Sequence, residues 1–211
     1  MTLMRAGRWV AADLHFHAHE TASTVALGLG GDTIDALAFT INTGSNSITN
    51  NGTLEADLSP LVVDSPVVGT GHIVIQDSTA EFASSVAAGQ TVTFSPTFPI
   101  DMLILEHAET FAGTIAGMAS TSRTVFDSVE LADFKFSSTK ITSVTGTGAI
   151  GTTTNVTLTD SVDRLTTTLH LLNQTANQFA VNASDYSLTA SGTGTLFSVD
   201  HTPGLPNIGV G

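Results

Sequence analysis

Residues 67–82, with the sequence VVGTGHIVIQDSTAEF, decide the fold. Ile73 and Ile75 lie two positions apart, which places both side chains on one face of a β-strand. Glycines precede this apolar run, and the polar residues QDST separate it from the next apolar residues. Turn residues at such short intervals leave no room for a helix between successive strands. The segment therefore predicts short strands joined by tight turns, the pattern of all-β structure.

The same pattern continues along most of the 211-residue chain, and the composition agrees with it. Only 12% of the residues are charged and 41% are hydrophobic, and threonine and serine are abundant. Threonine, valine and isoleucine favour a pleated surface over a helix, and the apolar content is too high for a disordered chain. We expect strands at residues 38–41, 47–55, 61–63, 71–76, 80–83, 91–94, 102–106, 111–115, 128–131, 140–144, 155–159, 166–172, 179–181 and 194–199.

A short motif, Gly-Thr-Gly-x-(Ile/Leu), occurs at residues 69–73, 146–150 and 192–196, and opens a β-like run each time. Its glycines supply turns that residues with a Cβ resist. A repeated turn before a strand favours a β-solenoid, in which the inward side chains of each turn stack on those of the next. The separations of 77 and 46 residues are not one fixed period, so three ordinary β-turns are the alternative interpretation.

Residues 48–118 contain the phrases ITNNGTLEAD, VVGTGHIVIQDSTAEF, VAAGQTVTF and LILEHAETFAGTIAGM. These phrases resemble the modules of large secreted or surface-exposed bacterial repeat proteins of the autotransporter and adhesin type, and residues 156–199 are similar to the segments on the C-terminal side of such modules. The resemblance implies a right-handed parallel β-helix, export from the cell, and a structural or adhesive role without a defined set of catalytic residues.

The chain departs from these modules at its start, which is rich in histidine, and we expect no anchoring barrel of amphipathic strands at its C-terminus. Its composition changes only gently along its length, so we expect one folded domain. We predict an N-terminal cap or leader-like segment at residues 1–37, a β-solenoid at residues 38–201, and a C-terminal tail at residues 202–211.

The charge balance limits the partners that the chain can bind. It has 19 acidic and 6 basic residues, for a formal net charge of -13. Nucleic acid and anionic membrane surfaces would be repelled, whereas cations are the natural counter-ions. The lack of cysteine excludes disulfides and cysteine-based zinc sites, and no apolar run is long enough for a membrane-spanning helix. We therefore expect neither a nucleic-acid partner nor a membrane span.

Three histidines near the N-terminus form the first candidate metal site. His15, His17 and His19 lie at alternate positions, so on a strand they share one face and could chelate a divalent metal. The phrase DLHFH also looks like the opening strand of metal-dependent hydrolases with barrel folds. The later histidines lie in β-rich sequence rather than in alternating β/α units. Adventitious surface binding and a solvated strand or cap are therefore the alternatives.

The sequence GLGGDTID at residues 28–35 supplies a second candidate site, for Ca²⁺. It looks like one copy of the Gly- and Asp-rich nonapeptide that binds calcium in secreted toxin repeats, with Asp32 and Asp35 as carboxylate ligands. A calcium roll shares each ion between adjacent copies, and here there is one imperfect copy. A plain turn before the strand at residue 38 is the favoured interpretation.

Carboxylates suitable for polysaccharide chemistry gather between residues 101 and 133, with Arg123 and Lys135 nearby. On a solenoid they could line one face, as the acids of polysaccharide-cleaving enzymes do, or they could be ordinary solubilising charges. We expect no enzymatic activity, because the chain has no nucleophile elbow and no phosphate-binding glycine loop before a helix. Paired threonines also suggest ice binding as a function, but their irregular spacing favours threonines on an ordinary solvated β-face. The candidate acids are Asp101, Glu106, Glu109, Asp127, Glu130 and Asp133.

Together these observations predict an exported β-solenoid that acts as a structural or adhesive element at the cell surface or outside the cell. Self-assembly is expected because the end turns of a short solenoid expose unpaired strand edges, which a second copy would satisfy. We therefore expect a homo-oligomer or filament, with Ca²⁺ screening the acids and a glycan or cell-surface molecule as the candidate ligand. The alternative is a β-helix that binds or cleaves polysaccharide.

Overall fold

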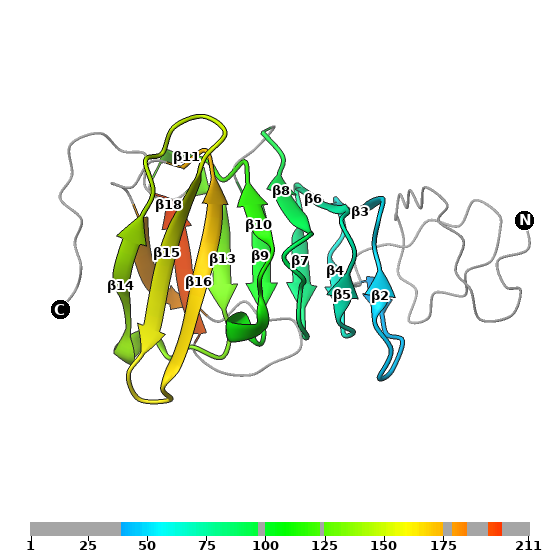
Figure 1. Cartoon of the computed structure of the whole chain (residues 1–211), viewed down its shortest axis with the longest axis horizontal. Helices are drawn as coiled ribbons and strands as arrows, with labels where there is room; N and C mark the ends of the chain where they lie inside the picture. The colour runs from blue at the N-terminus through cyan, green and yellow to red at the C-terminus, as the bar shows by residue number, and fades with distance from the viewer. Residues whose placement is uncertain (1–38, 97–99, 123–124, 175–178, 185–193, 200–211) are drawn as a thin grey trace, which may run out of the picture.

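The computed structural model of the protein describes residues 39–96, 100–122, 125–174, 179–184 and 194–199. These residues form a parallel β-solenoid of about four turns, whose strands stand side by side along the long axis of the molecule (Figure 1). Two seven-stranded sheets carry the stack, and two small two-stranded sheets accompany them. The predictions of all-β structure and of a β-solenoid are therefore confirmed.

Each of the four turns adds one strand to the first sheet, a short corner segment, and one strand to the second sheet. The first turn consists of β1 (Phe39–Ile41), β2 (Ile48–Thr49) and β3 (Thr53–Asp57), and the second of β4 (Leu61–Val63), β5 (Val67–Val68) and β6 (His72–Gln76). The third consists of β7 (Thr79–Phe82), the bridge residue Val86 and β8 (Thr91–Phe94). The fourth consists of β9 (Met102–Leu105), the 3-10 helix η1 (Ala108–Thr110) and β10 (Thr114–Ala116).

Equivalent strands stack in parallel and in register from turn to turn. In the first sheet a continuous row of paired positions is formed by Leu61, Ala80, Leu103 and Val129. The steps along this row are 19, 23 and 26 residues long, because the corner loops differ in length while the strands stay aligned. This variation explains why the sequence shows no fixed period.

One hydrophobic core runs through the interior of the stack. Alternate residues of each strand point inward, as Ile73 and Ile75 do in β6, and are fully buried. Burying apolar surface contributes roughly 25 cal/mol per Å², so these stacked rows are the main stabilising feature. The first sheet is buried on its outer face as well, where Val62, Ile104 and Leu196 lie apart from this core cluster. The middle strands of that sheet are therefore buried on both faces, as is usual for parallel strands.

The C-terminal part of the chain departs from parallel stacking. After the hairpin of β11 (Ser120–Ser122) and β12 (Val125–Phe126), the strand β13 (Ser128–Leu131) adds a further parallel strand to the first sheet. The strands that come after η2 (Phe136–Ser138) pair antiparallel, except that β16 runs parallel to β10. They are β14 (Thr139–Thr145), β15 (Thr153–Asp160), β16 (Leu165–Leu172), β17 (Phe179–Ser184) and β18 (Gly194–Val199).

Loop length explains this change of direction. The first sheet has the order β1-β4-β7-β9-β13-β18-β17, and the second has the order β14-β15-β16-β10-β8-β6-β3. Adjacent parallel strands require a crossover of a dozen or more residues, whereas residues 161–164 alone join β15 to β16. A connection this short permits only a hairpin. The parallel stack expected over residues 38–201 therefore ends in antiparallel strands in both sheets.

Most of the expected strand ranges agree closely with the observed ones, but β5, β11 and β12 were not predicted, and two further differences are instructive. The strand expected at 47–55 is two strands, because the chain turns at Asn50 between β2 and β3. The motif at 146–150 lies in the loop between β14 and β15, so it is not equivalent to the motif at 69–73, which joins β5 to β6. The predicted N-terminal cap or leader-like segment at 1–37 and the predicted tail at 202–211 lie outside the described residues.

A buried pair of amide side chains joins the first turn to the third at one corner. The Nδ2 atom of Asn50 donates to Oε1 of Gln90 at 2.8 Å, and the Nε2 atom of Gln90 donates to the backbone oxygen of Asn50 at 2.9 Å. Gly71 of the second turn lies at this corner, where a Cβ would come within 2.6 Å of Asn50 Cγ. Because Gly71 has no side chain, there is room at this corner for the two amide groups to meet.

The variant Gly71→Ala tests this corner. The added methyl group would lie 2.6 Å from Asn50 Cγ and from Gly52 O, so we expect it to disturb the amide pair. The free energy of unfolding should fall by about 1–3 kcal/mol. The matched control is Gly52→Ala at the same corner, where a Cβ meets nothing within 4 Å, and it should change stability by less than about 0.5 kcal/mol. Urea unfolding measures both variants, and equal stabilities would contradict the described packing.

Candidate functional site

The residues predicted as metal ligands lie outside the described part of the chain. His15, His17, His19, Asp32 and Asp35 all precede residue 39, at which the described part begins. The histidine site and the calcium site therefore stay predictions, and the structure neither brings these residues together nor separates them.

The acids between residues 101 and 133 form two close pairs rather than one row. Asp101 and Asp127 are fully buried and occupy equivalent positions before two strands of the first sheet. Glu109 and Asp133 meet at a corner that solvent reaches. Glu130 lies on β13 and is also fully buried. Glu106 comes directly after β9 and is half-buried, so Glu109 and Asp133 are the candidate acids that form a solvent-accessible pair.

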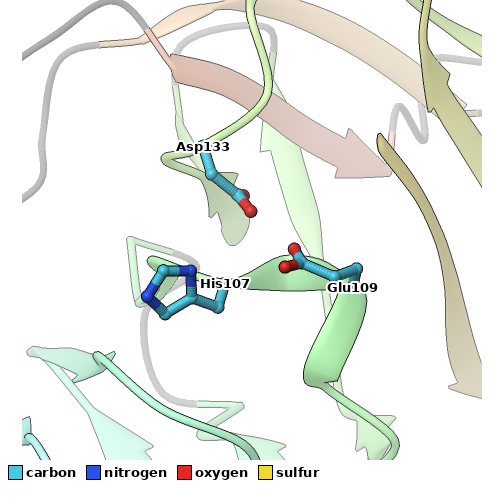
Figure 2. Close-up of side chains that lie close together, drawn as sticks. All are labelled: His107, Glu109 and Asp133. Carbon is cyan, nitrogen blue, oxygen red and sulfur yellow. The ribbon is translucent and has the colours of Figure 1, made fainter. Parts of the chain in front are cut away.

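His107 joins Glu109 and Asp133 in a three-residue cluster (Figure 2). One ligand atom from each of the three side chains lies within 4.8 Å of the others. His107 and Glu109 flank Ala108 at the start of η1, and Asp133 comes after β13 on the next turn. Figure 2 shows the carboxyl groups of Glu109 and Asp133 pointing toward one another, with the imidazole of His107 beside them. His107 and Glu109 are exposed and Asp133 is half-buried.

Backbone contacts hold the cluster in place. The backbone N–H and the hydroxyl of Thr110 both donate to the backbone oxygen of His107, at 2.9 and 2.8 Å. Ala108 is fully buried, and its N–H donates to Oδ1 of Asp133 at 3.3 Å. The hydroxyl of Thr167 donates to the backbone oxygen of Ala108 at 2.6 Å. The short helix η1 is thus fixed to the next turn and to β16, which preorganises the three side chains.

The two carboxyl groups of the cluster are hydrogen-bonded to each other. Burial raises the pKa of Asp133 to about 8, and the hydrogen bond with Glu109 and its negative charge act in the same direction. The hydrogen bond with Asp133 lowers the pKa of Glu109, and the nearby His107 contributes to that lowering. Near neutral pH the proton therefore stays on Asp133 and is donated to the ionised Glu109.

This geometry suits a divalent cation better than it suits the cleavage of a sugar. Two carboxylates and an imidazole are ligands that Zn²⁺ and Mn²⁺ accept, and a cation would take the place of the shared proton. Glycoside hydrolysis instead requires carboxyl groups about 5–10 Å apart, with room for the sugar or a water molecule between them. Here the ligand atoms of the two carboxyl groups lie within 4.8 Å of one another, which is below that separation.

Neither a protein-family model nor a curated protein matches the chain. No helix in the described part of the chain is long and apolar enough to cross a membrane. The resemblance to autotransporter and adhesin modules therefore rests on the phrases of the sequence alone and stays a prediction.

The variant Glu109→Gln tests the shared proton. Removing the charge of Glu109 should lower the pKa of Asp133 from about 8 toward the ordinary aspartate value, without reaching it because Asp133 stays half-buried. Carboxyl ¹³C chemical shifts measured by NMR as the pH changes report this pKa. The control Asp163→Asn removes an acid that pairs with Lys135 at 2.9 Å, and it should leave Asp133 unchanged. An unaltered pKa of Asp133 in Glu109→Gln would show that no proton is shared.

Proposed function

We propose that the protein is an exported structural or adhesive surface element that associates with copies of itself through the strand edges of its first turn. A difference between the two ends of the solenoid is the observation that carries the proposal. In the described part of the chain, β1 and β3 of the first turn are the outermost strands of their sheets, whereas β14 at the opposite end of the second sheet carries features that oppose pairing.

In the first turn, β1 pairs with β4 and β3 pairs with β6, and each has that single neighbour among the described strands. Phe39 donates its N–H to Pro60, and Ile41 accepts the N–H of Asp64. Because backbone groups along a strand point alternately to its two sides, the N–H and C=O of Thr40 point away from β4. Such an edge is a template for a strand of a second copy.

The opposite end of the second sheet is better protected. Its outermost strand, β14, shifts register against β15 between Ile141 and Ser143, and it carries the exposed Lys140. Bulges and lysines keep edge strands from pairing with other chains. We therefore expect a head-to-head pair, related by a two-fold axis, as the basic unit. Longer fibres or a surface layer then require a second contact, for which the outermost strand of the first sheet, β17, is the candidate.

The acidic charge of the chain sets the conditions for association. With a net charge of -13, two copies repel each other unless salt or a divalent cation such as Ca²⁺ screens them. Export to the cell surface or beyond is supported by the resemblance to adhesin modules. The chain has no cysteine, so an oxidising compartment would not alter its covalent structure through disulfides.

Glycan binding is the second candidate function, and the outer face of the second sheet favours it. Side chains in register on six neighbouring strands form one polar row on this face. The inward neighbours Val92 and Ile115 are fully buried, so the strands that carry the row are firmly held. Hydroxyl, imidazole and amide groups on a sheet can bond to sugar hydroxyls. The row consists of Thr53, His72, Thr91, Thr114, His170 and Asn155.

The variant Thr40→Pro tests association through the first turn. Proline removes the N–H that points away from β4, so it should block edge pairing while leaving the contacts of β1 with β4 in place. The control Thr40→Val keeps the N–H and a high strand propensity. Size-exclusion chromatography with light scattering, run with Ca²⁺ and with EDTA at moderate salt, measures the state of assembly.

We expect pairs or larger assemblies for the unaltered protein and for Thr40→Val, and monomers for Thr40→Pro. An unaltered protein that stays monomeric in every condition would contradict self-association. Retention of such a monomer on a glycan array would then favour the second candidate function.

A further inference from the structure

Two fully buried aspartates stack on each other at the corner that leads into the first sheet. Asp101 directly precedes β9 and Asp127 directly precedes β13, so they occupy the same position on successive turns. Neither residue has measurable exposed surface, at 0% each. We name this pair the acid column.

Each carboxyl group of the acid column binds backbone N–H groups of the turn before it. Asp101 accepts hydrogen bonds from the N–H of Ser78 and of Ser95, both at 3.1 Å. Asp127 accepts hydrogen bonds from the N–H of Asp101 at 3.1 Å and of Ala119 at 2.8 Å. The column thereby ties the third turn to the fourth, and the fourth turn to β13.

Asp127 also closes the base of the β11–β12 hairpin. Its backbone N–H donates to the backbone oxygen of Ala119 at 2.9 Å, while its side chain accepts the N–H of the same residue. The hairpin leaves the solenoid between β10 and β13. The two hydrogen bonds between Asp127 and Ala119 therefore join the base of the hairpin to the stack of turns. Loss of the side-chain bond would leave the backbone bond as the remaining one of these two described contacts between Asp127 and Ala119.

The acid column has no basic partner in the described part of the chain. Among the described residues, the charges that act on it are those of the two aspartates themselves and of Asp77, and all of them are negative. Burial raises the pKa of Asp101 to about 6 and that of Asp127 to about 7, although the backbone N–H donors oppose this rise. Both groups therefore change charge between mildly acidic and neutral pH.

We propose that the acid column is a proton-operated latch, closed in mildly acidic solution and loosened at neutral pH, which controls how firmly the β11–β12 hairpin is attached to the solenoid. Protonated carboxyl groups fit the dry corner without a buried charge. After both groups ionise, two negative charges share that corner, no basic residue of the described part of the chain pairs with them, and the corner must admit water. The latch acts within a single copy, so it does not depend on the proposed self-association.

The direction of the pH dependence comes from proton linkage. In the opened chain an aspartate has its ordinary pKa of about 3.9, which is below the values in the closed corner. Between about pH 4 and pH 7 the open form therefore holds fewer protons than the closed form. The closed form loses stability as the pH rises through this window. Below the window both forms are protonated, and above it the loss is complete.

Hydrogen exchange of the full chain, measured residue by residue from about pH 5 to about pH 8, tests the latch. After correction for the intrinsic exchange rate, the N–H groups of Ala119 and Asp101 should lose up to about tenfold in protection per pH unit for each group that titrates. The N–H of Gly71, which bonds to Asn50 at 2.9 Å in the first two turns, is the internal reference and should stay constant. Constant protection of Ala119 across the range would overturn the proposal.

The variant Asp127→Asn removes the titrating group at nearly unchanged size. We expect the pH dependence at Ala119 to weaken in it, because Asp101 alone then titrates in the corner, whereas the control Asp163→Asn should keep the profile of the unaltered protein. An unchanged pH dependence in Asp127→Asn would overturn the proposal. If that variant does not fold, the carboxyl ¹³C shift of Asp127 in the unaltered protein decides: a midpoint near pH 7 supports the latch, and a midpoint near the ordinary value of about 4 overturns it.

Discussion

In-register stacking of parallel turns is the constraint on which the rest of the structure depends. A strand inside the stack satisfies its backbone groups through the turns on either side, but the chain at a corner needs other partners. Asn50 and Gln90 meet this need at one corner by joining their side chains at 2.8 Å beside Gly71 of the intervening turn. Asn50 and Gln90 are 40 positions apart in the sequence, so their contact requires alternate turns to lie above one another.

The buried acids serve the same purpose at other corners, and the balance between burial and donated hydrogen bonds sets their charge. Asp160 accepts four hydrogen bonds, among them those of Lys135 N at 2.8 Å and Ser138 Oγ at 2.6 Å. Burial alone would raise its pKa, but these bonds lower it. Asp101 and Asp127 also accept hydrogen bonds from backbone N–H groups, but burial prevails in raising the pKa of both. Acids that all bind backbone N–H groups at corners therefore differ in charge. Asp160 is ionised, whereas Asp101 and Asp127 take up protons.

The sequence predicts the strands well and their assembly less well. Runs such as β6 reveal themselves because inward side chains recur at every second position. The two-residue strand β5 is too short to show that recurrence, and alternation is the same in parallel and antiparallel strands, so the change of direction after β13 was not predictable. Glu109 and Asp133 were among the candidate acids, but their pairing with His107 was missed because turns of unequal length hide which residues lie above one another.

A double-mutant cycle on Asn50 and Gln90 tests the stacking of the turns most directly. Free energies of unfolding are compared for Asn50→Ala, Gln90→Ala and the double variant. Since the two side chains are bonded across an intervening turn, we predict that the single losses are not additive, with a coupling of about 1–3 kcal/mol. Losses that add to within about 0.5 kcal/mol would contradict this stacking, because residues without a shared contact do not couple.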